Sequence, residues 1–381
     1  MVVRPGAHAG RSAAGKAGRH GGRLHRLQVR TQHLTAPLLK KELPMSRDTS
    51  ALASTPAPSG LRRRRLLLAA PFFGGMPAVP CMAAATPAAV AAPASVPATL
   101  RPLRLGTSTP GGGFSQYGEL LQAVLNRRQG RDLLQARPTR GTVENLELLQ
   151  RGELDMALIQ GTSADEVLQK GPAGGLCILY AMYPSPGMLA VPRASAARRL
   201  EDLAGQPVVF GVRTSGLVTL ARQVFTGIGL DIDRDFKAIY VERAADSPRI
   251  VLAGEAGGLW GAGEGWPGFV QVAQSPGGAR FIGPSPAQIP RIISRYPLLK
   301  GMDVPAQAYA GIESPLPTVG SVNLILARAD LDDARAQAFV TAMQQAGPEL
   351  TAALPQAGFS TLANTVASTP SPELLHRVLR G

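Results

Sequence analysis

Short apolar runs alternate with segments of helical periodicity in the second part of this chain. Residues 103–105, 133–137 and 156–159 are rich in apolar side chains and short enough to be strands. Residues 114–128 and 143–151 carry apolar side chains at the spacing of one helix face. A strand, helix, strand, helix order predicts an α/β fold with a mainly parallel sheet.

The same alternation restarts after Pro192. Residues 208–210 and 238–240 are predicted strands on either side of a helix over 216–227. A further apolar run at 321–326 is a strand that returns the chain to its first part. The pattern therefore favours two similar lobes over one continuous domain.

The restart and the return strand set the boundaries of these lobes. We expect one lobe to comprise residues 98–190 together with 321–381, and the other to comprise residues 191–320. The chain then crosses between lobes twice, so a hinge is expected near residues 187–192 and 321–327.

The strong positive charge of the chain, formally +14, belongs almost entirely to its first quarter. Residues 1–94 hold 14 of the 40 basic residues but only two of the 26 acidic ones. The remaining chain is nearly balanced, which argues against nucleic acid as a partner of the folded part.

The first segment has the order of an export signal. Arg62–Arg65 precede an apolar run at 66–73, and small residues follow at 83–85. The apolar run is too short, and too interrupted by proline and glycine, to span a bilayer. We therefore expect residues 1–97 to be a leader, export signal and linker, and the mature protein to be periplasmic.

Details of the leader stay open in the sequence. Arg63-Arg64 resembles a weak twin-arginine signal. Cys81 lies where a lipid-anchored cysteine could stand, but Pro80 before it disfavours a lipoprotein. Translation starts at Met1 or at Met45.

The expected mature segment is poor in catalytic and metal-ligating residues. It retains one cysteine, Cys177, and one histidine, His376. A zinc site and a Cys/His catalytic pair each need more than this, so we expect no metal, no cofactor and no catalytic residue. Cys177 lies in an apolar run and is expected to be a buried thiol.

Three hydroxyl-rich loops follow predicted strands and precede predicted helices, at residues 107–114, 139–142 and 211–216. In open α/β sheets a ligand binds beyond the carboxyl ends of the strands, where such loops meet helix N-termini. Each loop can donate amides and hydroxyls to a carboxylate. For any single loop, capping of the following helix is the alternative interpretation; three loops together favour a binding cleft.

A series of short motifs, in a specific order, resembles the TAXI family of TRAP-transporter solute receptors. The series covers roughly residues 100–350 and comprises Gly106-Thr107, Gly111-Gly112, Phe114, residues 142–146, residues 152–160, Tyr296-Pro297, residues 304–306, Tyr309 and residues 316–320.

This resemblance implies a type II periplasmic binding protein with two lobes, a ligand cleft between them and no enzymatic activity. It would act as a monomer that captures a small organic acid or amino acid, such as a glutamate-like compound or a dicarboxylate, and delivers it to TRAP-type integral membrane subunits. By position, the resemblance implies these ligand-binding residues: Thr107, Ser108, Thr109, Gly112, Phe114, Thr142, Asn145, Gln160, Arg213, Thr214, Ser215 and Gly216.

Several of these side chains have two interpretations. Arg213 is either a clamp for the ligand carboxylate or a solvated arginine beside a strand end, and Arg140 occupies the equivalent turn of the other lobe. The sequence leaves open which of the two contacts the ligand. Phe114 and Trp266 are expected to pack in the core or the cleft wall rather than to stack on a ligand.

Two other functions remain as alternatives. A ligand-sensing module that signals to a membrane partner without transport would have the same sequence features. A phosphate-binding enzyme is disfavoured, because the glycine-rich loop lacks the lysine and Ser/Thr of a P-loop and no nucleophile with a base is evident.

Overall fold

The computed structural model describes residues 101–171 and 174–380. The predicted leader, with Arg62–Arg65 and Cys81, lies outside the described residues. Its boundaries and its export function therefore stay predictions. All that follows concerns the described part of the chain.

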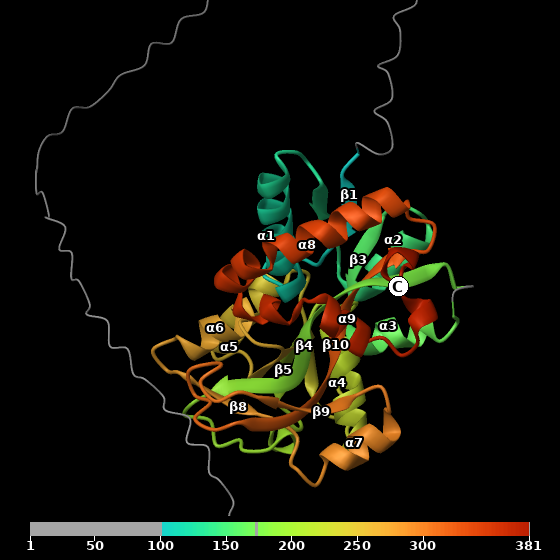
Figure 1. The fold of residues 1–381 in the computed structure, drawn as a ribbon. Coiled ribbons are helices and arrows are strands. Elements are labelled where there is room, and N and C mark those ends of the chain that lie inside the picture. The colour runs from blue at the N-terminus through green and yellow to red at the C-terminus, as the bar shows by residue number, and fades with distance from the viewer. Residues whose placement is uncertain (1–100, 172–173, 381) are drawn as a thin grey trace, which may run out of the picture. The chain divides into compact units, whose positions relative to one another are not determined.

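The first half of the described chain forms three parallel strands, each followed by a helix (Figure 1). Leu103 and Leu105 alternate into the core from the first strand, which pairs with both of the others. In chain order the elements are β1 (Leu103–Gly106), α1 (Gly113–Gln129), β2 (Leu134–Arg137), α2 (Thr142–Gln150), β3 (Met156–Ile159) and α3 (Gly161–Leu168).

The longest of these helices, α1, shows why this stretch is helical. Tyr117, Leu121, Val124 and Leu125 recur at helical spacing and are all buried on one face. Gly130 ends the helix with φ of 61°, a left-handed conformation that costs glycine little.

The second half repeats the alternation. Its first strand pairs in parallel with the next two, and its last two strands pair antiparallel with strands described below. The elements are β5 (Pro207–Gly211), α4 (Gly216–Gly227), β6 (Lys237–Tyr240), α5 (Ser247–Leu252), β7 (Gly258–Ala262), α6 (Pro267–Ala273), β8 (Ala279–Ile282), α7 (Ile289–Arg295) and β9 (Lys300–Val304).

Two long strands connect the halves, β4 (Leu176–Pro192) and β10 (Leu316–Arg328). They pair antiparallel with each other over residues 176–186 of β4. From Gly187 onward β4 pairs instead with β7 and β8. Figure 1 shows both strands running side by side from one half into the other.

All ten described strands belong to one sheet, with the main order β2-β1-β3-β10-β4-β7-β5-β6. Helices flank this sheet, so the α/β class that the order of strands and helices predicts is confirmed (Figure 1). The expectation of a mainly parallel sheet is wrong in the middle. Because β4 and β10 carry the chain out of one half and back again, they run antiparallel to their neighbours.

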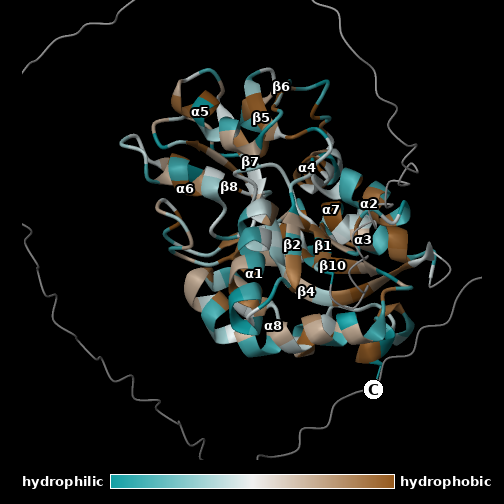
Figure 2. Ribbon diagram, turned by 90° about the horizontal axis from the view of Figure 1, so that it is seen from above, coloured by the Kyte–Doolittle hydropathy of each residue, from teal (hydrophilic) through white to brown (hydrophobic). Residues whose placement is uncertain are grey.

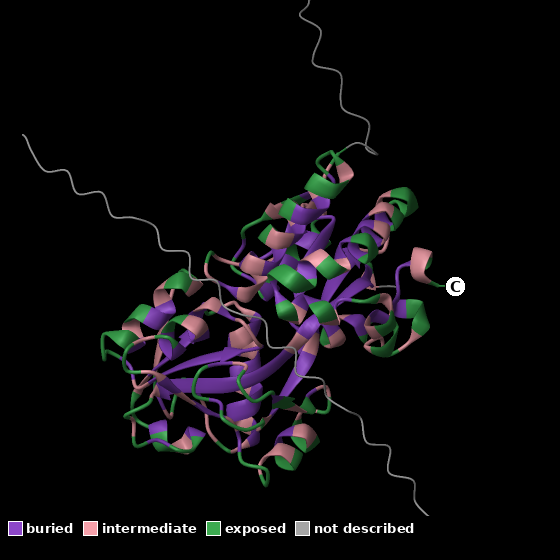
Figure 3. Ribbon diagram, turned by 60° about the vertical axis from the view of Figure 1, so that its left-hand side comes forward, coloured by how far each residue is buried: buried purple, intermediate pink, exposed green. Residues whose placement is uncertain are grey.

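The two C-terminal helices, α8 (Asp333–Ala353) and α9 (Leu362–Ala367), pack on the first half. Phe339 and Met343 of α8 join a core that includes Tyr117 and Leu121 of α1. Figure 2 shows hydrophobic strands among helices of mixed hydropathy, and Figure 3 shows the strands buried beneath partly exposed helices. None of the described helices combines the length and hydrophobicity of a membrane span.

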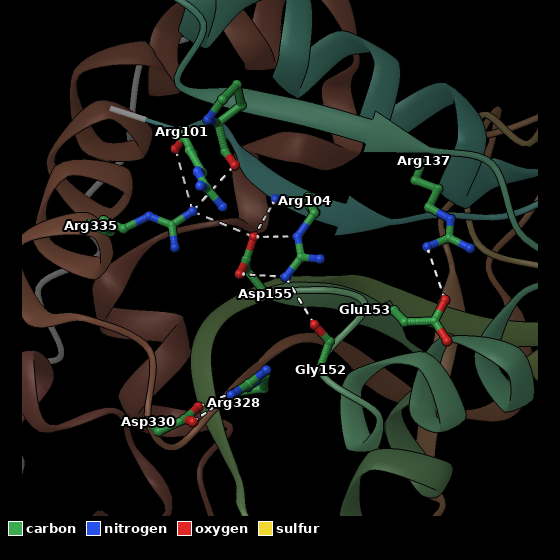
Figure 4. A network of polar contacts seen from close by, with 10 residues as sticks. Arg101, Arg104, Arg137, Gly152, Glu153, Asp155, Arg328, Asp330 and Arg335 are labelled. Carbon is green, nitrogen blue, oxygen red and sulfur yellow. Dashed lines mark hydrogen bonds and ion pairs between the residues drawn. The ribbon is translucent and has the colours of Figure 1, made fainter. Parts of the chain in front are cut away.

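A buried carboxylate ties the first half together (Figure 4). Asp155, just before β3, accepts hydrogen bonds from the backbone N–H of Arg104 at 2.9 Å and from its Nε at 3.0 Å. Arg335 of α8 approaches the same carboxylate at 3.4 Å. One carboxylate therefore joins β1, β3 and α8.

Cys177 lies on β4, 4% exposed, as the sequence predicted. Burial raises the pKa of its thiol to about 12. A thiol that stays protonated is a poor nucleophile.

Candidate functional site

A cavity of about 70 Å³ lies between the two halves. The loops that precede α1, α2 and α4 form much of its wall, and residues of β4 and β10 complete it. The loops before α1 and α2 follow the parallel strands β1 and β2, so these two helices begin at the same edge of the sheet. The loop before α4 follows β5, which runs in the opposite direction within the sheet, and it meets the α2 loop from the second half. The cavity is therefore where an α/β sheet places a ligand.

The structure brings most of the sequence-predicted residues to this cavity. The first-half loops contribute serine, threonine and glycine, and the second-half loop contributes the start of α4. The predicted residues that line it are Ser108, Thr109, Gly112, Phe114, Thr142, Gln160, Ser215 and Gly216.

Three other predicted residues support the loops from outside the cavity lining. Thr107 is 2% exposed and its hydroxyl donates to the carbonyl of Arg137 at 3.1 Å. The amide nitrogen of Asn145 donates to the carbonyls of Thr107 at 2.8 Å and Leu158 at 2.9 Å. The Thr214 hydroxyl donates to the carbonyl of Arg140 at 3.4 Å. These polar groups hold the loops in place.

The fourth predicted residue outside the lining is Arg213. Its guanidinium lies 3.8 Å from the centre of the Tyr240 ring and 3.9 Å from a carboxylate oxygen of Asp233. The side chain is 64% exposed. Of the two open interpretations, the geometry matches the solvated arginine. Arg140, by contrast, does line the cavity.

We predict that Arg213→Ala leaves ligand affinity unchanged and lowers the free energy of unfolding by about 0.5 kcal/mol, as an exposed cation–π contact allows. Calorimetric titration measures the ligand affinity, and chemical denaturation measures the free energy of unfolding. Arg140→Ala at the cavity rim is the matched comparison. A large loss of affinity in the Arg213 variant alone would restore the clamp interpretation.

Gln160 lines the cavity, but its side-chain amide makes hydrogen bonds within the protein. As the N-cap of α3, its Oε1 accepts from the N–H of Ser163 at 3.2 Å and from the hydroxyl of Thr162 at 2.8 Å. Its Nε2 donates to the hydroxyl of Ser321 on β10 at 2.9 Å. Gln160 thus fixes the wall of the cavity, and its side-chain amide is already engaged.

Hydrogen bonds join the two halves on both sides of the cavity. On one side, the N–H of Ala244 donates to the Thr109 hydroxyl at 3.0 Å and that of Ala245 to the Pro110 carbonyl at 3.0 Å. On the other side, the N–H of Val143 donates to the carbonyl of Thr214 at 3.3 Å. The halves are therefore in contact on both sides of the cavity, which lies between them.

Sequence reasoning missed several lining residues. Tyr183 and Ser185 come from β4, Ser247 from the start of α5 and Asn323 from β10. One signal was available for Asn323, since it is a single amide within the apolar run of a central strand. Trp266, expected in the core or the cleft wall, lines the cavity as well.

Four of these wall residues carry buried polar atoms that make no hydrogen bond within the described residues. They are Ser215 Oγ, Ser247 Oγ, Trp266 Nε1 and Asn323 Oδ1. A buried polar atom without a partner costs about 1–3 kcal/mol, so most native ones are satisfied. All four residues that carry these atoms line the cavity.

The electrostatics of the cavity are simple. Among the described lining residues, Arg140 has the one side chain that is charged at neutral pH. It is 65% exposed and lies 3.5 Å from Glu242. Burial raises the pKa of the Tyr183 phenol, which therefore stays neutral. The described residues contain no cluster of His, Cys, Asp and Glu that could hold a metal ion.

Residues 105–377 match the model of the NMT1-like family. This match spans more than half of the chain, and the protein belongs to the NMT1-like family. Comparison with curated protein sequences finds no match.

Solved structures similar to this chain include several binding proteins. The alkanesulfonate-binding protein SsuA from Xanthomonas axonopodis pv. citri, bound to MOPS, is 19% identical, with 73% of this chain and 82% of that chain covered and a TM-score of 0.39. A putative L-cystine ABC transporter from Listeria monocytogenes is 15% identical, with coverages of 68% and 98% and a TM-score of 0.43. A binding protein component of an ABC phosphonate transporter from Pseudomonas aeruginosa is 12% identical, with coverages of 68% and 80% and a TM-score of 0.44.

Proposed function

We propose that this protein is a periplasmic solute-binding receptor that closes around a small organic acid or amino acid and delivers it to a TRAP-type membrane transporter. The observation that carries the proposal is the cavity between the halves, which both halves line and which hydrogen bonds between the halves flank. In such an arrangement the halves can close over a ligand and separate to release it. Delivery to TRAP subunits and the periplasmic location rest on the sequence resemblance and the predicted leader.

The proposed contacts with the solute are hydroxyls and backbone amides. Ser108, Thr109, Thr142 and Ser215 line the cavity beside the starts of three helices. Helix N-termini favour carboxylate groups, because their first N–H groups have no partner within the helix. We leave Thr107, Asn145, Arg213 and Thr214 out of the contacting set, since they lie outside the lining.

We also propose a hinge where β4 and β10 pass between the halves. β4 changes partners at Pro186 and Gly187, and its pairing with β10 shifts register between Val322 and Leu324. Such an irregularity interrupts the ladder and lets strands bend. This position falls at the start of the predicted 187–192 segment and within 321–327. The predicted lobe boundaries remain part of the proposal.

The chemistry of the cavity wall supports binding without catalysis. His376, the single histidine in the described residues, is buried, and its ring Nε2 lies 3.1 Å from the carbonyl of Leu331. Burial lowers its pKa. Neither His376 nor Cys177 lines the cavity, so the described wall offers no Cys or His nucleophile or base.

Mass spectrometry of small molecules that co-purify with the exported protein tests the proposal. We expect one carboxylate-containing compound at near-stoichiometric amount, and calorimetry with that compound should give one site per chain. Absence of any co-purified compound, together with no binding across a panel of organic and amino acids, would overturn the receptor function. The same panel with a purified membrane partner tests delivery separately.

A further inference from the structure

The charge balance of the cavity limits the class of solute. The described lining residues include no aspartate and no glutamate, and their one charged side chain, Arg140, is cationic. A ligand ammonium group in this cavity would find no carboxylate side chain in the lining as a partner. Burying a charge without a partner is costly, so the wall disfavours an amino acid.

The backbone adds positive potential to the same wall. α1, α2 and α4 all begin at the cavity. The N-cap residues Gly112 and Gly141 have no side chain to cap their helices, and the Ser215 side chain does not cap α4. One N–H at the start of α1 donates to the Ser108 hydroxyl, and one at the start of α2 donates to the Thr214 carbonyl. The partial positive charges of these helix starts favour an anion and oppose a cation.

The unpartnered buried side chains point to the same ligand. Ser247 is fully buried and Trp266 is 3% exposed; both residues line the cavity, and each has a buried polar atom without a hydrogen bond among the described residues. The indole N–H can only donate, and a hydroxyl can donate, so both suit carboxylate oxygens. Asn323 is also fully buried, and its free Oδ1 accepts a hydrogen bond, for example from a ligand hydroxyl.

We infer that the solute is a small carboxylate without an ammonium group, such as a 2-hydroxy acid, and that the receptor discriminates against the corresponding amino acid. This inference rests on the proposed receptor function and narrows its ligand class. The volume of about 70 Å³ leaves room for a small solute rather than a large one.

Matched pairs of ligands test the inference by calorimetry: lactate with alanine, 2-hydroxyisovalerate with valine, and 2-hydroxyglutarate with glutamate. In every pair that binds, we expect the hydroxy acid to bind at least about 100-fold more tightly than the amino acid, as the penalty for an unpaired buried charge requires. Equal or tighter binding of the amino acid overturns the inference and leaves the receptor function standing. A co-purified compound with an ammonium group would also overturn the inference without overturning the receptor function. No binding in either series and no co-purified compound would overturn both.

A variant pair tests the role of the unpartnered hydroxyl. Ser247→Ala should weaken binding of the hydroxy acid by about tenfold or more, since hydrogen bonds to charged groups are the stronger ones. Its melting temperature without ligand should not fall, because this hydroxyl has no partner to lose. Ser275→Ala is the control: it loses a 2.8 Å bond to the carbonyl of Val272, outside the cavity, and should bind normally. Wild-type affinity in Ser247→Ala would count against the hydroxyl as an anchor.

Discussion

Gly216→Ala is expected to weaken ligand binding about 10- to 100-fold, because overpacking an interface costs about 1–3 kcal/mol. A Cβ at this position would lie 2.7 Å from the Thr142 hydroxyl oxygen and against the Gln160 side chain. Gly216 is the first residue of α4 in the second half, whereas both neighbours belong to the first half. The added methyl therefore opposes closure of the cleft.

The expected effect on folding is small. Alanine is a better helix former than glycine, and the clash disappears when the halves separate. We expect the ligand-free melting temperature to stay the same or rise slightly. Small-angle scattering with saturating ligand should show a smaller decrease in radius for the variant than for the wild type.

Gly347→Ala is the matched control. Gly347 lies within α8, and nothing lies within 4 Å of an added Cβ. This variant should gain about 0.5–1 kcal/mol of stability and bind normally. If Gly216→Ala also bound and compacted like the wild type, closure through this contact would be wrong.

The sequence was sufficient to predict which loops line the cavity, because their position follows from strand order. Parallel strands end at one edge of a sheet, so the loops that include Thr109 and Thr142 meet there. The second-half loop with Ser215 joins them across the cleft. The residue type alone, however, does not determine whether a loop side chain points into the cavity or away from it. Thr107 and Thr109 are two residues apart, yet only Thr109 lines the cavity.

The rest of the wall depends on long-range packing that sequence periodicity does not encode. Ser185 and Asn323 lie on strands that cross between the halves, and they contact each other at 2.6 Å although 138 residues separate them. To predict that these strands run antiparallel to their neighbours, one would also need to know how the chain connects the two halves. Arg213 illustrates a further limit, since its contact with Tyr240 of the neighbouring strand competes with any ligand.

The second large effect is expected for Asp155→Asn, which should lower the free energy of unfolding by about 2–3 kcal/mol at neutral pH. The carboxylate side chain is 12% exposed and faces two arginines, of which Arg335 is 16% and Arg104 43% exposed (Figure 4). Removing the charge leaves a largely buried Arg335 without its anion. Breaking a fully buried ion pair costs about 3–5 kcal/mol. Because Arg104 is partly exposed to solvent, we expect a loss at or below the low end of that range.

The contribution of Asp155 to the free energy of unfolding should depend on pH. Burial raises the pKa of Asp155, but hydrogen bonds from the side chain and backbone of Arg104 and the charge of Arg335 outweigh burial and lower the pKa below its usual range. A lowered folded-state pKa gives stability that is present above the unfolded pKa of about 3.9 and is lost as the pH falls through the folded value. The wild type should therefore lose this contribution below about pH 4, and the variant should lack that part of the slope.

Asp330→Asn is the matched control for this measurement. Asp330 also pairs with an arginine, Arg328, but its side chain is 67% exposed. Exposed pairs contribute about 0–1 kcal/mol, so this variant should unfold almost like the wild type.

Urea titrations at pH 7 and at pH 3.5 measure the free energy of unfolding of the wild type and both variants. The two variants should differ at pH 7 and converge toward the wild type at the lower pH, because protonation removes the same charge from Asp155 that the substitution removes. Equal unfolding free energies for both variants at pH 7 would mean that the Asp155 ion pairs do not stabilise the first half.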